Sequence, residues 1–397
     1  MKFNKWTLGL AAVGAVSLTS VAQAEEKLML GSQAELTSTT ISGYVSTSVH
    51  WDFGNDADAA NTRGYSYSGG KGDGFNLDVV DISLEKALDE SEWASGYKAE
   101  LWFGPDAQAI GSQFAGAADG DVAIKQAFVA LRTPLGNGID WKIGVFDTII
   151  GYESSNAGDN PNYTRSWGYT IEPTQHTGIL GTYRFCDTVS ASFGVANTWN
   201  APINGRDTHD TTKTWMGSVA LTAPESFGFL QGGSLYAGVV DGTLGGIANA
   251  GSDTRTSYYL GASIPTPIEG LKAGVAFDYL VMNNRPGNAN GNSSALAAYL
   301  SLRATEKLTL NGRVDYIRLG GDGLAGGGNI LGNPAAFAPT DEFIATTLTA
   351  DYQLWKNVIS RAELRWDTDL GQNGGKHFRS GLDDNEFTLA ANFIYKF

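Results

Sequence analysis

The chain has 397 residues, of which 17% are charged and 11% aromatic, with 51 glycines, one cysteine and four histidines. Acidic residues outnumber basic ones by 42 to 27, so the formal charge is −15. A single cysteine excludes a disulfide framework and a multi-cysteine zinc site, and the acidic balance argues against nucleic-acid binding. We expect neither a cofactor nor a metal site, and the composition favours an all-β fold.

The first 24 residues have the features of a secretory signal. Lys2 and Lys5 precede a short apolar run, Trp6–Leu18, and Ala22-Gln23-Ala24 fits the small-residue rule for cleavage. The run is shorter than the roughly 20 apolar residues that span a bilayer as a helix. We therefore expect a signal peptide at 1–24 and a single domain at 25–397. No later stretch has 18 consecutive apolar residues, which leaves a secreted β-protein or a transmembrane β-barrel.

Along the mature chain apolar and polar residues alternate with a period of two. In Leu308–Tyr316, for example, Leu308, Leu310 and Val314 share one face, whereas Arg313 and Asp315 share the other. About sixteen such segments are expected, most of them close to the 9–11 residues of a membrane-crossing strand. They are 40–52, 76–88, 95–104, 122–133, 139–146, 176–184, 188–197, 213–222, 234–241, 256–263, 270–280, 294–303, 307–316, 342–352, 357–367 and 386–397.

The connections between these segments alternate between short turns and long loops rich in Gly, Asn, Asp and Pro. This alternation is typical of outer-membrane barrels, whose turns are periplasmic and whose loops are external. A β-sandwich has no reason for it, and a propeller motif of about 40–50 residues does not recur. The prediction is an all-β transmembrane antiparallel barrel of about 16 strands in the outer membrane of a Gram-negative-type bacterium, in contact with its lipid.

Two further features carry a family resemblance. The chain ends in Phe397 with aromatic residues at alternate positions before it, which is similar to the assembly signal of Gram-negative outer-membrane proteins. The stretch 141–153, WKIGVFDTIIGYE, together with 160–166, Glu172-Pro173 and 176–178, resembles the OmpL-like family of β-barrel porins. Ile149 occupies the position at which the motif of that family usually has a proline. The resemblance implies an outer-membrane porin that is assembled through Phe397, and sixteen-stranded porins are commonly homotrimers.

The longest connection, 147–175, follows the fifth predicted strand. In general porins the loop at that place folds inward and narrows the lumen, and the resemblance implies a constriction loop here. A solvated external loop is the alternative. The charged residues of this constriction loop that we single out are Asp147, Glu153, Asp159, Arg165 and Glu172.

The alternation also predicts which charged residues line the pore. They are Lys98, Glu100, Arg132, Asp140, Lys142, Arg303, Arg313, Asp315, Arg361, Glu363 and Arg365. Cross-strand ion pairs that stiffen the wall are one interpretation, and a transverse field that orients solutes is the other. Because this wall is balanced and the loop is acidic, we expect a weakly cation-preferring passive channel for small hydrophilic solutes. A sugar- or anion-selective channel, an outer-membrane hydrolase and an adhesive barrel are alternatives, but no catalytic motif supports an enzyme.

Overall fold

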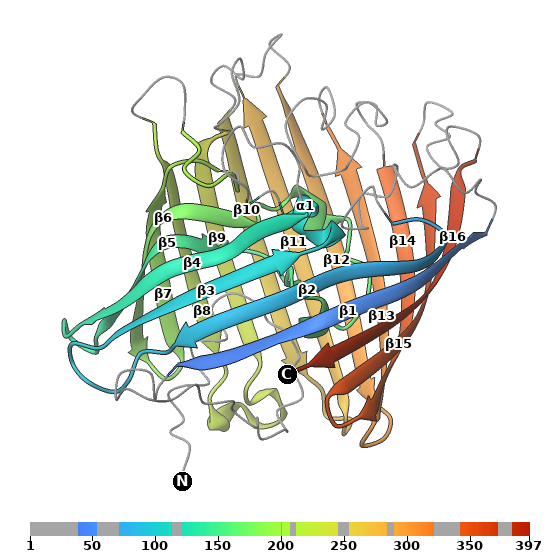
Figure 1. Ribbon diagram of the computed structural model, residues 1–397, viewed down its shortest axis with the longest axis horizontal. Coiled ribbons are helices and arrows are strands. Elements are labelled where there is room, and N and C mark those ends of the chain that lie inside the picture. Colours follow the sequence, from blue (N-terminus) through green and yellow to red (C-terminus); the bar gives the residue numbers. More distant parts are fainter. Residues whose placement is uncertain are drawn as a thin grey trace.

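The computed structural model describes residues 39–53, 71–110, 112, 121–199, 201–206, 212–244, 254–283, 290–320, 342–371 and 383–397. Sixteen strands form one closed antiparallel barrel in which sequence neighbours pair (Figure 1). The strands are β1 Thr40–Phe53, β2 Gly74–Lys86, β3 Ser95–Phe103, β4 Val122–Thr133, β5 Ile139–Asp147, β6 Gln175–Cys186, β7 Val189–Ala196, β8 Thr214–Thr222, β9 Ser234–Thr243, β10 Thr254–Pro265, β11 Leu271–Asn283, β12 Gly291–Arg303, β13 Leu308–Leu319, β14 Glu342–Trp355, β15 Val358–Asp369 and β16 Asn385–Lys396.

The barrel closes between its first and last strands. The register runs from Tyr44 opposite Lys396 to Phe53 opposite Phe387. The backbone groups of Gly43 and Phe397 exchange two hydrogen bonds of 3.1 and 3.0 Å at the end of this seam. The predicted all-β barrel is therefore confirmed, and every predicted strand end lies within three residues of the observed one.

The two faces of each strand differ in the way that a membrane barrel requires. On β13, Leu310 and Val314 point outward and are exposed, whereas Asn311, Arg313 and Asp315 point inward and are buried. Apolar side chains on the outer face meet lipid, and polar ones face the lumen. Because the outer face of the strands carries charge only near the strand ends, as at Arg318 and Glu342, the low charged fraction of the chain follows from the fold.

The connections sort into two rims. Short turns join β2 to β3, β4 to β5 and so on along one rim, and the strands joined by the longer connections, such as β1 and β2, end and begin at the other rim (Figure 1). The described parts of the connections contain four short helical segments: α1 Pro105–Ala109, η1 Ala157–Asp159, η2 Gly168–Ile171 and η3 Glu225–Leu230. None of the described helices is long and apolar enough to cross a membrane. The expected signal peptide lies outside the described residues.

Candidate permeation site

The connection between β5 and β6, residues 148–174, crosses the interior of the barrel; we call it the crossing loop. Its contacts lie on strands far away around the barrel. The Asn162 Nδ2 donates to Thr349 Oγ1 on β14 at 2.7 Å, and Asn311 Nδ2 on β13 donates to the Pro161 carbonyl at 2.7 Å. Arg361 on β15 donates to the Ala157 carbonyl at 2.7 Å. The loop therefore spans the lumen.

Glu363 on β15 is the main polar anchor for the middle of the crossing loop. Its carboxylate accepts the backbone N–H of Tyr163 at 2.6 Å and that of Thr164 at 2.9 Å. The hydroxyls of Thr164 and Thr349 donate to it at 2.6 and 2.7 Å. Hydrogen bonds to an ionised carboxylate are stronger than neutral ones, so the three from Tyr163 and Thr164 hold the loop in a defined position, and the one from Thr349 fixes the carboxylate to the wall.

Two inward-facing arginines bind both the loop and neighbouring carboxylates. Arg313 pairs with Glu153 of the loop at 2.8 Å and with Asp315 at 2.9 Å, and these side chains are at most 1% exposed. Arg365 pairs with Asp367 at 2.7 Å. Both guanidinium groups also donate to loop carbonyls. A buried charge requires such complete pairing, so these arginines fix the loop to the wall.

Trp167 anchors the next part of the loop. Its indole N–H donates to Asp367 at 2.8 Å, its backbone N–H donates to Asp315 at 2.7 Å, and its ring stacks on Phe343 at 5.2 Å. A buried indole needs a partner for its polar end. Trp167 has one, and it belongs to a hydrophobic cluster between the loop and the wall that also contains Tyr299.

The loop returns to β6 beside a pair of carboxyl groups. Glu172 of the loop is buried next to Asp278 of β11. Burial, together with the Asp278 carboxylate, raises the pKa of Glu172 well above its usual range. Gly151 lies against the same carboxyl, and a Cβ there would collide with it. The raised pKa favours the protonated form of the Glu172 carboxyl.

A second buried polar network connects the loop to the first strands. Lys71 pairs with Asp78 of β2 at 3.0 Å and also with Asp106 of α1. The Tyr163 hydroxyl lies 3.1 Å from Asp78 and 2.7 Å from the His50 ring. Burial and the Asp78 charge raise the pKa of Asp106 to about 6 against the opposing effect of Lys71. Thus α1 is folded into the barrel as well.

The wall beside the root of the crossing loop is rich in lysine. Lys125 pairs with Asp147 at 2.6 Å and lies 3.7 Å from Glu100, and Lys98 pairs with Glu100 at 3.0 Å. Lys142 lies 5.1 Å from the Phe128 ring centroid. Among the described residues, Lys142 is the lysine of this wall without an ion-pair partner.

The remaining predicted site residues lie elsewhere. Arg132 pairs with Asp140 at 2.6 Å near the short-turn rim, and Arg303 is exposed at the last position of β12, on the same rim. The structure does not bring these three to the crossing loop. Asp159 lies 3.5 Å from Lys396. Arg165 is buried and donates to backbone carbonyls of the loop itself.

Two important inward residues, Asp78 and Lys125, escape the alternation because of β-bulges. The pairing of β1 with β2 steps from Val79 to Leu77, and the pairing of β3 with β4 steps from Gln126 to Ile124. A bulge inserts one unpaired residue and shifts the faces beyond it. The skipped residues, Asp78 and Lys125, consequently turn inward next to an inward neighbour. The one sign in the sequence that Asp78 and Lys125 turn inward is that each is a charged residue on an otherwise apolar strand face.

Comparison with known proteins agrees with this geometry. Residues 38–397 match the family model described as "Putative beta-barrel porin-2, OmpL-like". The chain belongs to this family. It is therefore a porin-type channel protein of the Gram-negative outer membrane, and its family and fold are those of a channel rather than an enzyme. No curated protein matches it.

Solved structures show the same fold at low identity. An anion-selective porin from Comamonas acidovorans has 14% identity and a TM-score of 0.60, with 91% of this chain and 99% of that chain covered. OmpT of Vibrio cholerae has 11% identity and a TM-score of 0.57, and the match covers 94% of this chain and 100% of the OmpT chain. The channel DcaP of Acinetobacter baumannii has 13% identity and a TM-score of 0.56, and the match covers 90% of this chain and 97% of the DcaP chain.

The described residues offer no metal centre. No group of three or more His, Cys, Asp or Glu side chains among them is arranged to hold a metal ion. Glu153, Asp315, Glu363 and Asp367 are instead bound by arginines, hydroxyls or backbone N–H groups, and Glu172 and Asp278 lie against each other.

Proposed function

We propose that the protein is a passive diffusion channel for small hydrophilic solutes and ions, in which the crossing loop forms the constriction. The observation that carries this proposal is the attachment of the loop to the inner wall through Glu363, Arg313 and Arg365. A loop held by buried charge-assisted hydrogen bonds remains across the lumen and reduces its width. Sixteen-stranded barrels are otherwise wide enough for an aqueous channel.

In this proposal solutes pass on the side of the loop that faces β3–β5. The anchoring contacts lie on β1, β2 and β11–β15, so the loop is packed against these strands rather than against β3–β5. A small cavity lined by Asp147, Ser155, Tyr169 and Glu172 lies near the root of the loop. Lys98 and Lys142 stand on the opposing wall. Polar and charged groups on both sides suit hydrated solutes rather than apolar ones.

The proposed ion preference is weakly cationic. The chain carries a net charge of −15, and an acidic chain concentrates cations around its entrances. Inside, however, Glu153, Asp147 and Asp315 are all paired with bases. Paired charges contribute little net field, which is the reason for expecting a weak preference rather than a strong one.

An anion-selective channel is the second candidate. It is favoured by the lysines on the β3–β5 wall, above all by Lys142 over the Phe128 ring. The Comamonas acidovorans structure with the same fold is described as an anion-selective porin. The two candidates differ in the sign of the reversal potential and can be separated by that measurement alone.

Recording from planar bilayers that contain the refolded full-length protein tests the channel function. We expect stepwise increases in conductance from a sample that needs detergent and shifts its electrophoretic mobility on heating. A correctly folded sample that conducts no ions contradicts the proposal. A folded sample is recognised by the heat shift, so a failure to refold is not mistaken for a closed channel.

We further propose that the protein assembles as a homotrimer and is recognised by the outer-membrane assembly machinery through Phe397. One solved neighbour is a trimer form of OmpT. The Phe397 ring is half exposed on the outer face, next to the β1–β16 seam. Chemical crosslinking in native membranes, followed by mass measurement in detergent, distinguishes a trimer from a monomer.

A further inference from the structure

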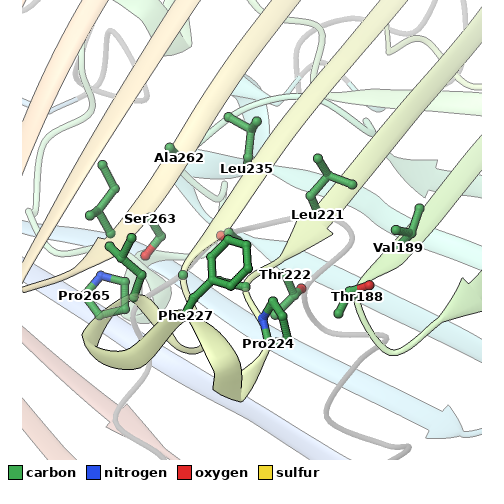
Figure 2. A pocket seen from close by; sticks show the side chains of 15 residues that line it. Thr188, Val189, Leu221, Thr222, Pro224, Phe227, Leu235, Ala262, Ser263 and Pro265 are labelled. Carbon is green, nitrogen blue, oxygen red and sulfur yellow. The ribbon is translucent and has the colours of Figure 1, made fainter.

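The outer face of the barrel carries an apolar groove at its short-turn rim (Figure 2). The groove lies between strands β7–β10 and the turn that joins β8 to β9, and its volume is about 590 Å³. This is within the range of roughly 300–1,000 Å³ found for pockets that hold small-molecule ligands. It is separate from the crossing loop and from the lumen.

One wall of the groove is a row of apolar side chains at the same height on four strands. Val189 of β7 is paired with Leu221 of β8, Leu221 with Leu235 of β9, and Leu235 with Ala262 of β10. Paired residues point to the same side of a sheet. Leu221 and Leu235 are more than 40% exposed, so this row lies on the lipid-facing surface, and Ala262 makes a depression in it.

The other wall is the turn 223–233, the longest connection on the short-turn rim. Its helical segment η3 places Phe227 and Leu230 along the groove, and Figure 2 shows the Phe227 ring between Leu235 and Pro224. Gly228 has a φ of 62°, a conformation that glycine adopts without strain and that interrupts the helix. A Cβ at Gly233 would lie 2.9 Å from Pro265, so the turn packs closely against the start of the next turn.

The position of the groove determines what fills it. Its apolar row continues into the lipid-facing surface of the barrel, since Val219, Ala237 and Leu260 lie on the same face of β8, β9 and β10. The short-turn rim of an outer-membrane barrel lies at the periplasmic leaflet. Thr222, Ser234 and Ser263 follow the apolar row on the short-turn side, where each is next in sequence to one of its members. The site is therefore apolar along its length.

We propose that this groove binds one acyl chain of a glycerophospholipid from the periplasmic leaflet. The chain would lie along the Leu221–Leu235–Ala262 row beneath Phe227, with its ester group at the short-turn rim. An acyl chain seated in this concave site is contacted by apolar side chains on two sides. It therefore makes more van der Waals contacts than a chain that lies against the flat outer face of the barrel. The proposal needs the barrel to be in the membrane but does not depend on its conducting ions.

Photo-crosslinking tests the site. The full-length protein is reconstituted into vesicles that contain phosphatidylethanolamine with a diazirine at the end of one acyl chain. After irradiation, labelled peptides are identified by mass spectrometry. We expect the peptides with Leu221, Phe227 and Leu235 to be labelled about tenfold more than the peptide with Leu300, an exposed lipid-facing residue on β12.

A matched pair of variants supplies the control. Ala262→Trp fills the groove, and Ala298→Trp adds the same bulk to the outer face of β12. We expect the first to lose the excess labelling and the second to keep it, with the heat shift in mobility showing that both have folded. Uniform labelling of the wild-type protein around the barrel overturns the proposal, as does a groove that crosslinks to a second copy of the chain instead of to lipid. The wild-type measurement decides the question even if a variant does not fold.

Discussion

Glu172 and Asp278 bring two carboxyl groups together where the crossing loop returns to β6. Burial and the neighbouring carboxylate raise the pKa of Glu172 well above its usual range. The folded protein therefore binds this proton more tightly than the unfolded chain does. The stabilisation is complete below about pH 4, the ordinary range of a carboxyl group, and it is lost as the pH rises through the raised pKa.

We accordingly predict that the melting temperature of the refolded protein falls as the pH is raised above the ordinary carboxyl range. Below the raised pKa, each pH unit removes up to about 1.4 kcal/mol of unfolding free energy. Glu172→Gln keeps the shape and removes the titration, so its melting temperature should depend less on pH. Circular dichroism during heating measures both. Glu306→Gln, in an exposed turn, is the control. Equal pH dependence in Glu172→Gln and the wild-type protein would contradict the prediction.

Arg313 contributes to the loop's position through its carboxylate partners. Removing it leaves Glu153 and Asp315 buried without their cation, a change that typically costs about 3–5 kcal/mol. We predict that Arg313→Ala releases the loop and gives larger, noisier single-channel currents than the wild-type protein. Arg303→Ala is the matched control, because Arg303 is exposed at the short-turn rim, and it should leave the currents unchanged. Quiet, wild-type currents from Arg313→Ala would show that the arginine does not hold the loop.

At the scale of elements, the strands could be predicted from the sequence and the path of the crossing loop could not. Strand alternation is a local property, repeated every two residues, and it located all sixteen strands. The loop's path depends instead on contacts between residues far apart in the chain, such as Tyr163 with Glu363. No local pattern contains that information. Bulges limited the prediction in a second way, because they turned Asp78 and Lys125 inward against the alternation.

The crossing loop can be tested as a unit. Replacing 150–172 with a short Gly/Ser linker removes the segment that contacts β13–β15 and leaves all sixteen strands intact. We predict a several-fold larger single-channel conductance, because the lumen of a sixteen-stranded barrel is wide when no loop occupies it. The heat shift in mobility shows whether the barrel has formed. An unchanged conductance in a folded barrel would place the loop outside the permeation path.

At the scale of the whole molecule, the charge is divided by location. The outer surface of the strands is mainly apolar, and most charged side chains of the interior pair with one another or bind the loop, as Arg361 does with Asp351. The chain has 42 acidic and 27 basic residues. Because the interior charges are largely paired, this acidic excess produces only a small net field within the constriction. Long-range attraction of cations to the acidic molecule is screened by salt over about 10 Å at 0.1 M.

This division predicts how ion selectivity should vary with salt. In a gradient of potassium chloride across a planar bilayer, we expect a small reversal potential of the sign given by cation preference. It should be larger in a dilute gradient than in a concentrated one, because salt screens the acidic surface. Lys142→Ala removes a positive charge that has no ion-pair partner among the described residues, and it should increase the cation preference. A reversal potential of the anionic sign would instead favour the lysine wall of β3–β5 as the selective element, and Lys142→Ala should then reduce it.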